Sequence, residues 1–381
     1  MLHRIRAVAF AAAAELALAP APSRAVTNPD LSVIGQPTAR VTDDAADPAR
    51  ERVAFDPGET ELVFDAALNP FARGWFVIAF GDEGAEVEEA FLTVNRGLPG
   101  GLGLKAGQYL AGFGKVNGTH PHAYPFGGRF RVLEAFLPGE ESFKEVGVQL
   151  SRRFAPWGDA ALTASVDLLQ GDAFRREREP SGAPNDPLDA TAEGDRADEP
   201  RPAALGRLAA FLPFDDRSGV EIGVNATQGV NNVAAGTRTT LIGADVKAKL
   251  WTGERSSLLL QGEALRLARE EAGWDEAAAA YTSAETSPLG FYAFADYAFD
   301  PRWNAGLAFE RWQDPAADDL WNTGLRAFAG FKLLEETTAV RLDWEHVRPG
   351  TPEGATEDPD AVNALTLRVI FSMGPHKAHQ F

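Results

Sequence analysis

The segment "TTAVRLDWEH" (residues 337–346) decides the fold, because apolar and polar side chains alternate along it. Val340, Leu342 and Trp344 share one face of an extended chain. Arg341 and Asp343 lie on the other face, followed by Glu345. Strict alternation indicates a β-strand with one apolar face and one polar face, since successive side chains leave opposite faces of a pleated strand.

The same alternation occurs along most of the chain beyond residue 58. It is clear in "GVEIGVNAT" (219–227), "LIGADVKAKL" (241–250) and "NALTLRVIF" (363–371). We predict sixteen strands, at 31–41, 59–68, 73–80, 86–94, 101–110, 145–154, 160–169, 203–212, 219–227, 239–250, 256–267, 289–298, 302–311, 324–333, 337–346 and 362–371. A soluble sandwich and a membrane barrel share this period, so the connections must distinguish them.

The connections fall into two classes. Those after even-numbered strands have three to six residues, whereas seven of the eight after odd-numbered strands are longer, including 111–144, 170–202, 268–288 and 347–361. Short periplasmic turns opposite long extracellular loops are typical of a transmembrane barrel. The fold predicted is therefore all-β, a transmembrane antiparallel barrel of about sixteen strands. Pro37 interrupts the first strand, and without that strand the number is fourteen.

Closure of the sheet has a physical reason in lipid. Backbone N–H and C=O groups that stay unpaired in hydrocarbon each cost several kcal/mol, and a closed barrel pairs them all. Sixteen strands leave room for an aqueous lumen, which the polar rows would face. The segment 111–144 is the candidate constriction, and the candidate pore-lining residues are Lys105, Asp245, Lys247, Lys249, Arg326, Arg341, Asp343, Glu345 and Arg368.

The two ends of the chain carry their own signals. His3, Arg4 and Arg6 precede an apolar run and the small-residue site "SRA", which predicts a signal peptide over 1–25. A short amphipathic helix is the alternative for this segment. Residues 26–381 are then a single barrel domain, with 372–381 as a periplasmic tail. No apolar stretch of the length needed for a membrane-spanning helix follows the N-terminus.

Two segments resemble known outer-membrane proteins. "EVEEAFLTVN" followed by "GLGLKAGQYLAGFGKVN" is similar to a strand pair of the phosphate-selective porin O/P superfamily, with the match at Leu104, Lys105, Gly107, Gln108, Tyr109, Phe113 and Gly114. "NPDLSVIG", "FGKVNGTHPHAYPF" and "FSMGPHKAHQF" resemble small proteobacterial barrels often labelled zinc-regulated TonB-dependent receptors. The resemblance implies an outer-membrane barrel in the bacterial cell.

The chain departs from both groups. TonB-dependent receptors need about 22 strands and a plug, for which this chain has no room. Phosphate-selective pores are lined by basic residues, but the loops here are acidic, as in "DPAADDLWN" with Asp314, Asp318 and Asp319, and the net charge is −19. The acidic loops indicate either a rim that binds divalent cations beside lipopolysaccharide or a funnel that concentrates cations. Both interpretations predict a preference for cations.

Histidines form two pairs. His120 and His122 flank Pro121, which favours an extended chain and places both imidazoles on one face. Such a pair supplies two Zn²⁺ ligands, and a stable site needs more. His376 and His379 form a second pair, but the tail should be periplasmic and the loop extracellular, so a joint site requires the loop to descend into the lumen. The alternative is a loop anchored by its prolines and aromatic residues.

The sequence excludes several other classes. It has no cysteine, its acidic charge disfavours nucleic acid, and it carries no nucleophile elbow, phosphate loop or His-Glu-x-x-His motif. We predict no enzyme and no required cofactor. The predicted function is passive passage of small hydrophilic solutes or ions, with lipid and lipopolysaccharide as surroundings and a homotrimer as a candidate assembly. The alternatives are a zinc-linked binding or uptake barrel and a closed structural barrel.

Overall fold

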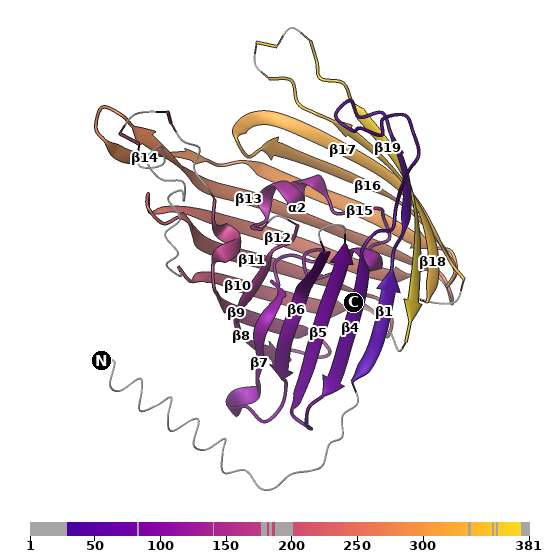
Figure 1. The fold of residues 1–381 in the computed structure, drawn as a ribbon. Helices are drawn as coiled ribbons and strands as arrows, with labels where there is room; N and C mark the ends of the chain where they lie inside the picture. The colour runs from indigo at the N-terminus through magenta and orange to yellow at the C-terminus, as the bar shows by residue number, and fades with distance from the viewer. Residues whose placement is uncertain are drawn as a thin grey trace.

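The computed structural model describes residues 29–81, 84–139, 141–176, 181–182, 185–186, 201–333, 337–352, 354–355 and 357–374. The predicted signal peptide and the terminal histidines His376 and His379 lie outside these residues. The described chain forms one antiparallel β-barrel (Figure 1). Its strand segments are β1 (Asp30–Gly35), β2 (Thr38–Thr42), β3 (Ala54–Asp56), β4 (Thr60–Ala67), β5 (Ala72–Gly81), β6 (Gly84–Val94), β7 (Leu102–Leu110), β8 (Lys144–Phe154), β9 (Ala161–Leu169), β10 (Ala203–Pro213), β11 (Gly219–Asn232), β12 (Thr237–Trp251), β13 (Ser257–Asp275), β14 (Ala280–Thr286), β15 (Leu289–Ala298), β16 (Trp303–Asp314), β17 (Ala317–Lys332), β18 (Thr338–Arg348) and β19 (Val362–Met373).

These nineteen segments make a wall of sixteen strands. Pro37 separates β1 from β2 within the first wall strand, and residues 57–59 separate β3 from β4 within the second. β14 pairs only with the far end of β13, as part of a projecting hairpin. The prediction of sixteen strands is confirmed, and the alternative of fourteen is wrong.

The first strand closes the ring despite its proline. β1 pairs with β4 on one side, where Asp30 faces Asp65, and with β19 on the other, where Val33 faces Met373. Beyond the break, β2 continues the pairing with β19. Because Pro37 lies at the break, the proline removes no hydrogen bond from the middle of either segment.

The predicted alternation is confirmed. On β12, Ile242 points outward and is 53% exposed, whereas Asp245 points inward and is 3% exposed. On β18, Leu342 and Trp344 are exposed while Asp343 and Glu345 are buried. The outward face is therefore apolar around the ring, which suits hydrocarbon, and the polar row faces the interior.

The connections follow the predicted asymmetry, with a correction to their form. Short turns of four to seven residues follow the even-numbered wall strands. On the opposite side, parts of the predicted loops are strand: β13 and β14 form a hairpin over most of 268–288, and β16 and β17 continue through most of 312–323. Backbone pairing continues past the predicted strand ends there, because a hairpin pairs the backbone of residues that alternation alone does not mark as strand.

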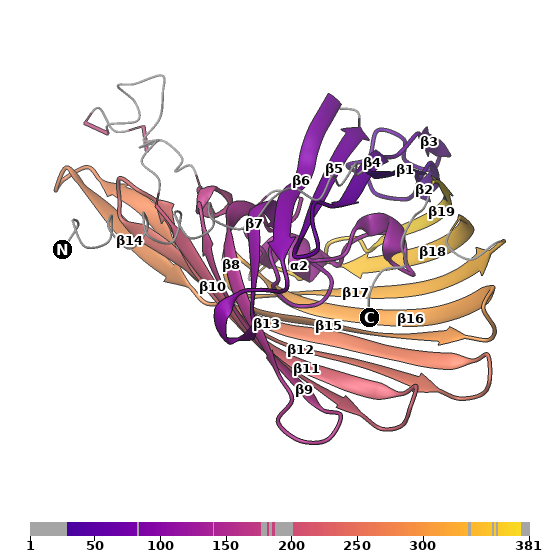
Figure 2. The ribbon, with the colours of Figure 1, turned by 90° about the horizontal axis from the view of Figure 1, so that it is seen from below.

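The segment between β7 and β8 folds into the barrel. We call residues 111–143 the constriction loop; it contains the short helices η2 (Pro121–Ala123) and α2 (Arg131–Phe136). Figures 1 and 2 show α2 between the wall made by β4–β7 and the wall that runs from β11 to β17. The loop therefore lies inside the lumen, where the sequence predicted a constriction. Among the described residues, no helix is both long and apolar enough to cross a membrane.

The constriction loop builds an apolar core inside the ring. Phe126 and Phe130 are buried against Tyr292, Phe294 and Phe328 of the wall. Phe130 stacks on Tyr292 with ring centroids 4.0 Å apart. A large part of the interior is therefore packed protein, because inward apolar side chains on β12 to β17 meet the aromatic side chains of the loop.

Aromatic residues near the short turns serve two different roles. Trp157, Phe299 and Trp303 are exposed, as a membrane-interface girdle requires. Trp75 instead donates its indole N–H to Glu89 inside the barrel, at 3.1 Å, and Trp251 lines an interior cavity. The sequence shows that aromatic residues lie near the turns. It does not show whether each side chain points toward lipid or into the barrel, because this depends on where the strand begins.

Candidate functional site

The constriction loop is fixed at its neck by one amide side chain. Asn117 donates to the carbonyl oxygens of Ala111 and Phe143, at 2.8 and 2.9 Å, and accepts from the N–H of Phe143. The N–H groups of Lys115 and Val116 donate to the buried carboxylate of Glu263 on β13. Hydrogen bonds of Asn117 thus join the two ends of the loop, and Glu263 binds the start of the loop to β13.

Wall arginines hold the loop further along. Arg326 donates to the carbonyl oxygens of Gly128 and Arg129, at 2.6 and 2.7 Å. Arg341 donates to the carbonyl oxygen of His122, at 2.8 Å. Guanidinium groups suit this role, because their donors form a rigid fork that can satisfy adjacent carbonyls inside a protein.

The structure places most of the predicted lining residues in two groups, with Arg341 in both and Lys105 in neither. One group contacts the constriction loop or stays buried behind it: Arg326, Arg341, Asp343, Glu345 and Arg368 lie against the loop, and Asp245 is held by Arg207 at 2.6 and 2.9 Å. Lys105 is placed over the rings of Phe91 and Tyr109. The second group, Lys247 and Lys249 together with Arg341, borders a cavity.

This cavity lies below the loop and beside the short turns. It has a volume of about 460 Å³. Basic side chains outnumber acidic ones in its lining: Lys115, Lys247, Lys249, Arg255, Arg302, Lys332 and Arg341 against Glu254, Asp296 and Asp300. The cavity is therefore a charged chamber, richer in basic than in acidic side chains, on the short-turn side of the constriction loop.

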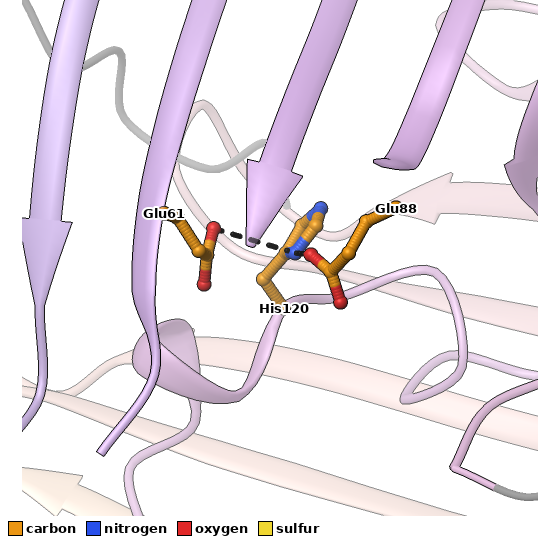
Figure 3. A group of neighbouring side chains, drawn as sticks. All are labelled: Glu61, Glu88 and His120. Atoms are coloured by element: carbon orange, nitrogen blue, oxygen red, sulfur yellow. Dashed lines mark ion pairs between the residues drawn. The ribbon is translucent and has the colours of Figure 1, made fainter. Parts of the chain in front are cut away.

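The side chains of His120 and His122 point toward the wall strands β4 and β6. Their rings stack with centroids 5.7 Å apart, and both side chains are buried. His122 Nδ1 is 2.7 Å from Glu61 on β4, and His120 Nε2 is 3.1 Å from Glu89 on β6. Glu88 also reaches His120, with Oε2 at 3.2 Å from Nδ1 (Figure 3). The predicted pair therefore lies among carboxylates.

A β-bulge brings Glu88 and Glu89 to this site. Val77 pairs with Glu89 but the next residue, Ile78, pairs with Val87, so Glu88 is the extra residue on β6. The side chain of Gln108 donates to the carbonyl oxygen of Glu88 at 3.3 Å and so supports the bulge. Neighbouring residues of a regular strand face opposite sides, whereas a bulge lets both side chains reach one site. Alternation in the sequence assigns Glu88 and Glu89 to opposite faces, so it cannot predict that both reach His120.

The carboxylates also determine the charge of His120. Burial lowers the pKa of His120, but the contacts with the carboxylates of Glu88 and Glu89 and the charge of Glu61 outweigh burial. The net result is a pKa well above the ordinary value of a histidine. Without a bound cation, His120 is then an imidazolium that ties the loop to β4 and β6. His376 and His379 fall outside the described residues, and a joint site with them stays a prediction.

Comparison with known proteins gives one relative by sequence. No family model matches the chain. An uncharacterized protein of Aquifex aeolicus (strain VF5) is 29% identical over 275 residues, which is 68% of this chain and 55% of that protein. The chain thus spans about half the length of this relative.

Solved structures share the fold at low identity. The outer-membrane channel DcaP of Acinetobacter baumannii has a TM-score of 0.58 at 12% identity, over 93% of this chain and 100% of that one. An anion-selective porin of Comamonas acidovorans has a TM-score of 0.58 at 11% identity, over 91% of this chain and 100% of that one. OprB of Pseudomonas putida has a TM-score of 0.53 at 10% identity, over 91% and 94%.

This chain is an outer-membrane β-barrel with the porin fold. The predicted fold class is confirmed, and the fold shared with outer-membrane channels confirms the bacterial outer-membrane localisation. The closed ring and its apolar outer face suit lipid. The two narrower resemblances, to phosphate-selective porins and to proteins labelled zinc-regulated receptors, stay predictions. The motif of the first resemblance has a structural role here, since Gln108 supports the bulge and Phe113 enters the interior core.

Proposed function

We propose that this porin barrel passes small hydrophilic solutes or ions by passive diffusion and is not an enzyme. The observation that carries the proposal is the constriction loop, which narrows a sixteen-stranded ring but leaves a charged cavity of about 460 Å³ beneath it. A barrel with a purely structural role does not require such a cavity. A charged lining favours water and small hydrophilic solutes, because charged side chains are costly to remove from water.

Within this proposal, the pore prefers cations. The support is the excess of 55 acidic over 36 basic residues, including exposed carboxylates on the outer hairpins such as Glu285. A negative mouth raises the local concentration of cations. The basic cavity acts in the opposite sense, so the preference depends on the acidic mouth and on Glu61, Glu88 and Glu89 beside the constriction loop.

Conductance in a planar bilayer tests both parts. We expect discrete open steps from the purified barrel and, under a KCl gradient, a reversal potential on the cation side. A barrel that inserts without conducting contradicts the diffusion channel and favours a closed barrel. Steps with an anion-side reversal potential retain the channel but contradict the cation preference.

We also propose that the barrel lies in lipid and lipopolysaccharide as a homotrimer. OmpT of Vibrio cholerae, solved in a trimer form, has a TM-score of 0.55 with this chain at 12% identity. Outward Val146, Val148, Val166 and Leu168 give β8 and β9 an exposed aliphatic face. Native mass spectrometry in mild detergent should give three chains, and a single chain would contradict the trimer.

A second candidate function is a zinc-linked binding or uptake barrel. The specific observation is that His120 and His122 each contact a glutamate of the wall. Histidine with carboxylate is a donor set that zinc accepts. This function differs from simple diffusion in requiring a metal complex at the constriction loop.

A further inference from the structure

We propose that Glu61, Glu88 and His120 form a Zn²⁺ site that fastens the constriction loop to β4 and β6. The proposal deepens the second candidate function by naming the ligands and the effect of the metal. It does not depend on whether the pore conducts. The three residues come from two wall strands and the loop and converge on one point (Figure 3).

The spacing of the donor atoms matches tetrahedral zinc. His120 Nδ1 lies 3.2 Å from Glu88 Oε2 and 3.5 Å from Glu61 Oε2, and all three donor atoms lie within 4.8 Å of one another. Zinc binds imidazole nitrogen and carboxylate oxygen at about 2.0–2.2 Å, which places tetrahedral neighbours about 3.3–3.5 Å apart. A zinc ion between these atoms therefore needs little movement of the side chains.

The orientation of His120 supports a ligand role for its Nδ1. Nε2 lies 3.1 Å from Glu89 Oε2, so Glu89 can accept the Nε2 proton and leave the Nδ1 lone pair toward Glu61 and Glu88. Metal-ligating histidines characteristically donate their second N–H to a carboxylate in this way. Glu89 is therefore a positioning residue rather than a ligand.

A second observation points to a ligand at this place. His120 is 7% exposed, and its Nδ1 is aimed between Glu61 and Glu88: among the described residues it has only ion-pair contacts with these carboxylates, at 3.5 and 3.2 Å, and no hydrogen bond of good geometry. The Oε2 atom of Glu88 is also buried without a hydrogen bond among these residues. A buried polar atom without a well-formed hydrogen bond is destabilising, and coordination of a cation would satisfy both atoms.

The donor set favours zinc over other divalent cations. Ca²⁺ and Mg²⁺ prefer six or more oxygen ligands or retained waters, whereas an imidazole suits zinc. Three protein ligands leave one position for water or for a ligand from the lumen. Metal binding would replace the imidazolium contacts between loop and wall with coordinate bonds, and so would restrain the constriction loop.

The test is calorimetric titration of ZnCl₂ into the untagged barrel carrying His376→Ala and His379→Ala, which removes the tail histidines. We expect one Zn²⁺ per chain, no saturable binding of Mg²⁺, and loss of the site in His120→Ala and Glu88→Gln. Glu89→Gln should weaken binding about 10- to 100-fold, as loss of a supporting carboxylate does in other sites. His346→Ala, whose imidazole contacts Asn363 at 2.9 Å on the outer part of β18, is the matched control.

Thermal unfolding of the same proteins separates site loss from misfolding. Zn²⁺ should raise the unfolding temperature of the parent and of His346→Ala but not of His120→Ala. Absence of zinc binding in a folded parent, or equal binding by His120→Ala, overturns the proposal. Either result leaves the cluster as a proton-dependent anchor and leaves the conductance of the pore to be judged separately.

Discussion

Single carboxylates decide how the constriction loop sits in the barrel. Glu263 is almost fully buried and accepts hydrogen bonds from the N–H groups of Lys115 and Val116, at 2.6 and 3.0 Å, and from the hydroxyl of Tyr292 at 2.5 Å. Gly114 permits this approach, because a Cβ there would lie 2.0 Å from the Glu263 carboxylate. One side chain thereby fixes the start of the loop.

Replacing Glu263 should loosen the loop. We expect Glu263→Ala to lower the free energy of unfolding by about 2–3 kcal/mol, because buried N–H donors lose a charged acceptor. Urea unfolding in lipid vesicles measures this change. Glu254→Ala, at an exposed residue of a short turn, is the control and should leave stability within about 0.5 kcal/mol. Equal effects of the two substitutions would contradict the anchoring role.

Gly107 matters for a different reason. Its φ is +132°, and a Cβ there would lie 2.1 Å from the carbonyl oxygen of Ala90. We expect Gly107→Ala to abolish most of the folded barrel, because backbone atoms of β6 and β7 would have to separate in the wall. Heat-modifiable migration on gels reports the folded fraction. Gly206→Ala in β10, where a Cβ meets open space, should fold normally.

At the scale of elements, the constriction loop is held as a small domain inside the ring. Phe126 and Phe130 supply its core, and α2 adds Val132, Leu133 and Phe136. The N–H of Val132 donates to Glu310 on β16, at 3.1 Å. The loop therefore has the burial and hydrogen bonding of a structural element, and in the proposed channel its position sets the size of the passage.

Truncating Phe130 tests this packing. Phe130→Ala should cost about 3–5 kcal/mol as a buried cavity forms, and single-channel conductance should rise as the loop moves more freely. Phe80→Ala, on the exposed outer face of β5, removes the same atoms without touching the loop. Unchanged conductance in Phe130→Ala would show that the loop does not limit the passage.

Across the whole molecule, charge is separated along the proposed path. Exposed carboxylates such as Glu276 and Glu285 lie on the β13–β14 hairpin, and others lie beside His120. Lys247 and Lys249 face the cavity near the short turns. The acidic and basic regions have opposite effects on ion selectivity. Charges beside the constriction loop should dominate, because salt screens buried charges less than exposed ones.

Reversing the cavity charge should shift selectivity. We expect the double variant Lys247→Glu and Lys249→Glu to move the reversal potential further toward cations, with a larger shift at low salt. Bilayer recordings at two KCl concentrations measure it. Arg238→Glu, on the exposed outer hairpin of β12, is the control for charge alone. An equal shift in the control would show that the cavity lysines do not contact the permeating ions.

The sequence by itself determined the wall of this protein, because alternation depends only on neighbouring residues. Leu342 faces outward and Asp343 faces the interior, whatever the position of the strand in the ring. The lengths of the connections then show at which end of the barrel each hairpin turns. It also identified the loop and its histidines. Only the tertiary structure decided that Arg326, Arg341 and Arg368 hold this loop, and that a bulge brings Glu88 and Glu89 to His120. These contacts join residues far apart in the chain and depend on register, and a single inserted residue changes register without changing the pattern on either side.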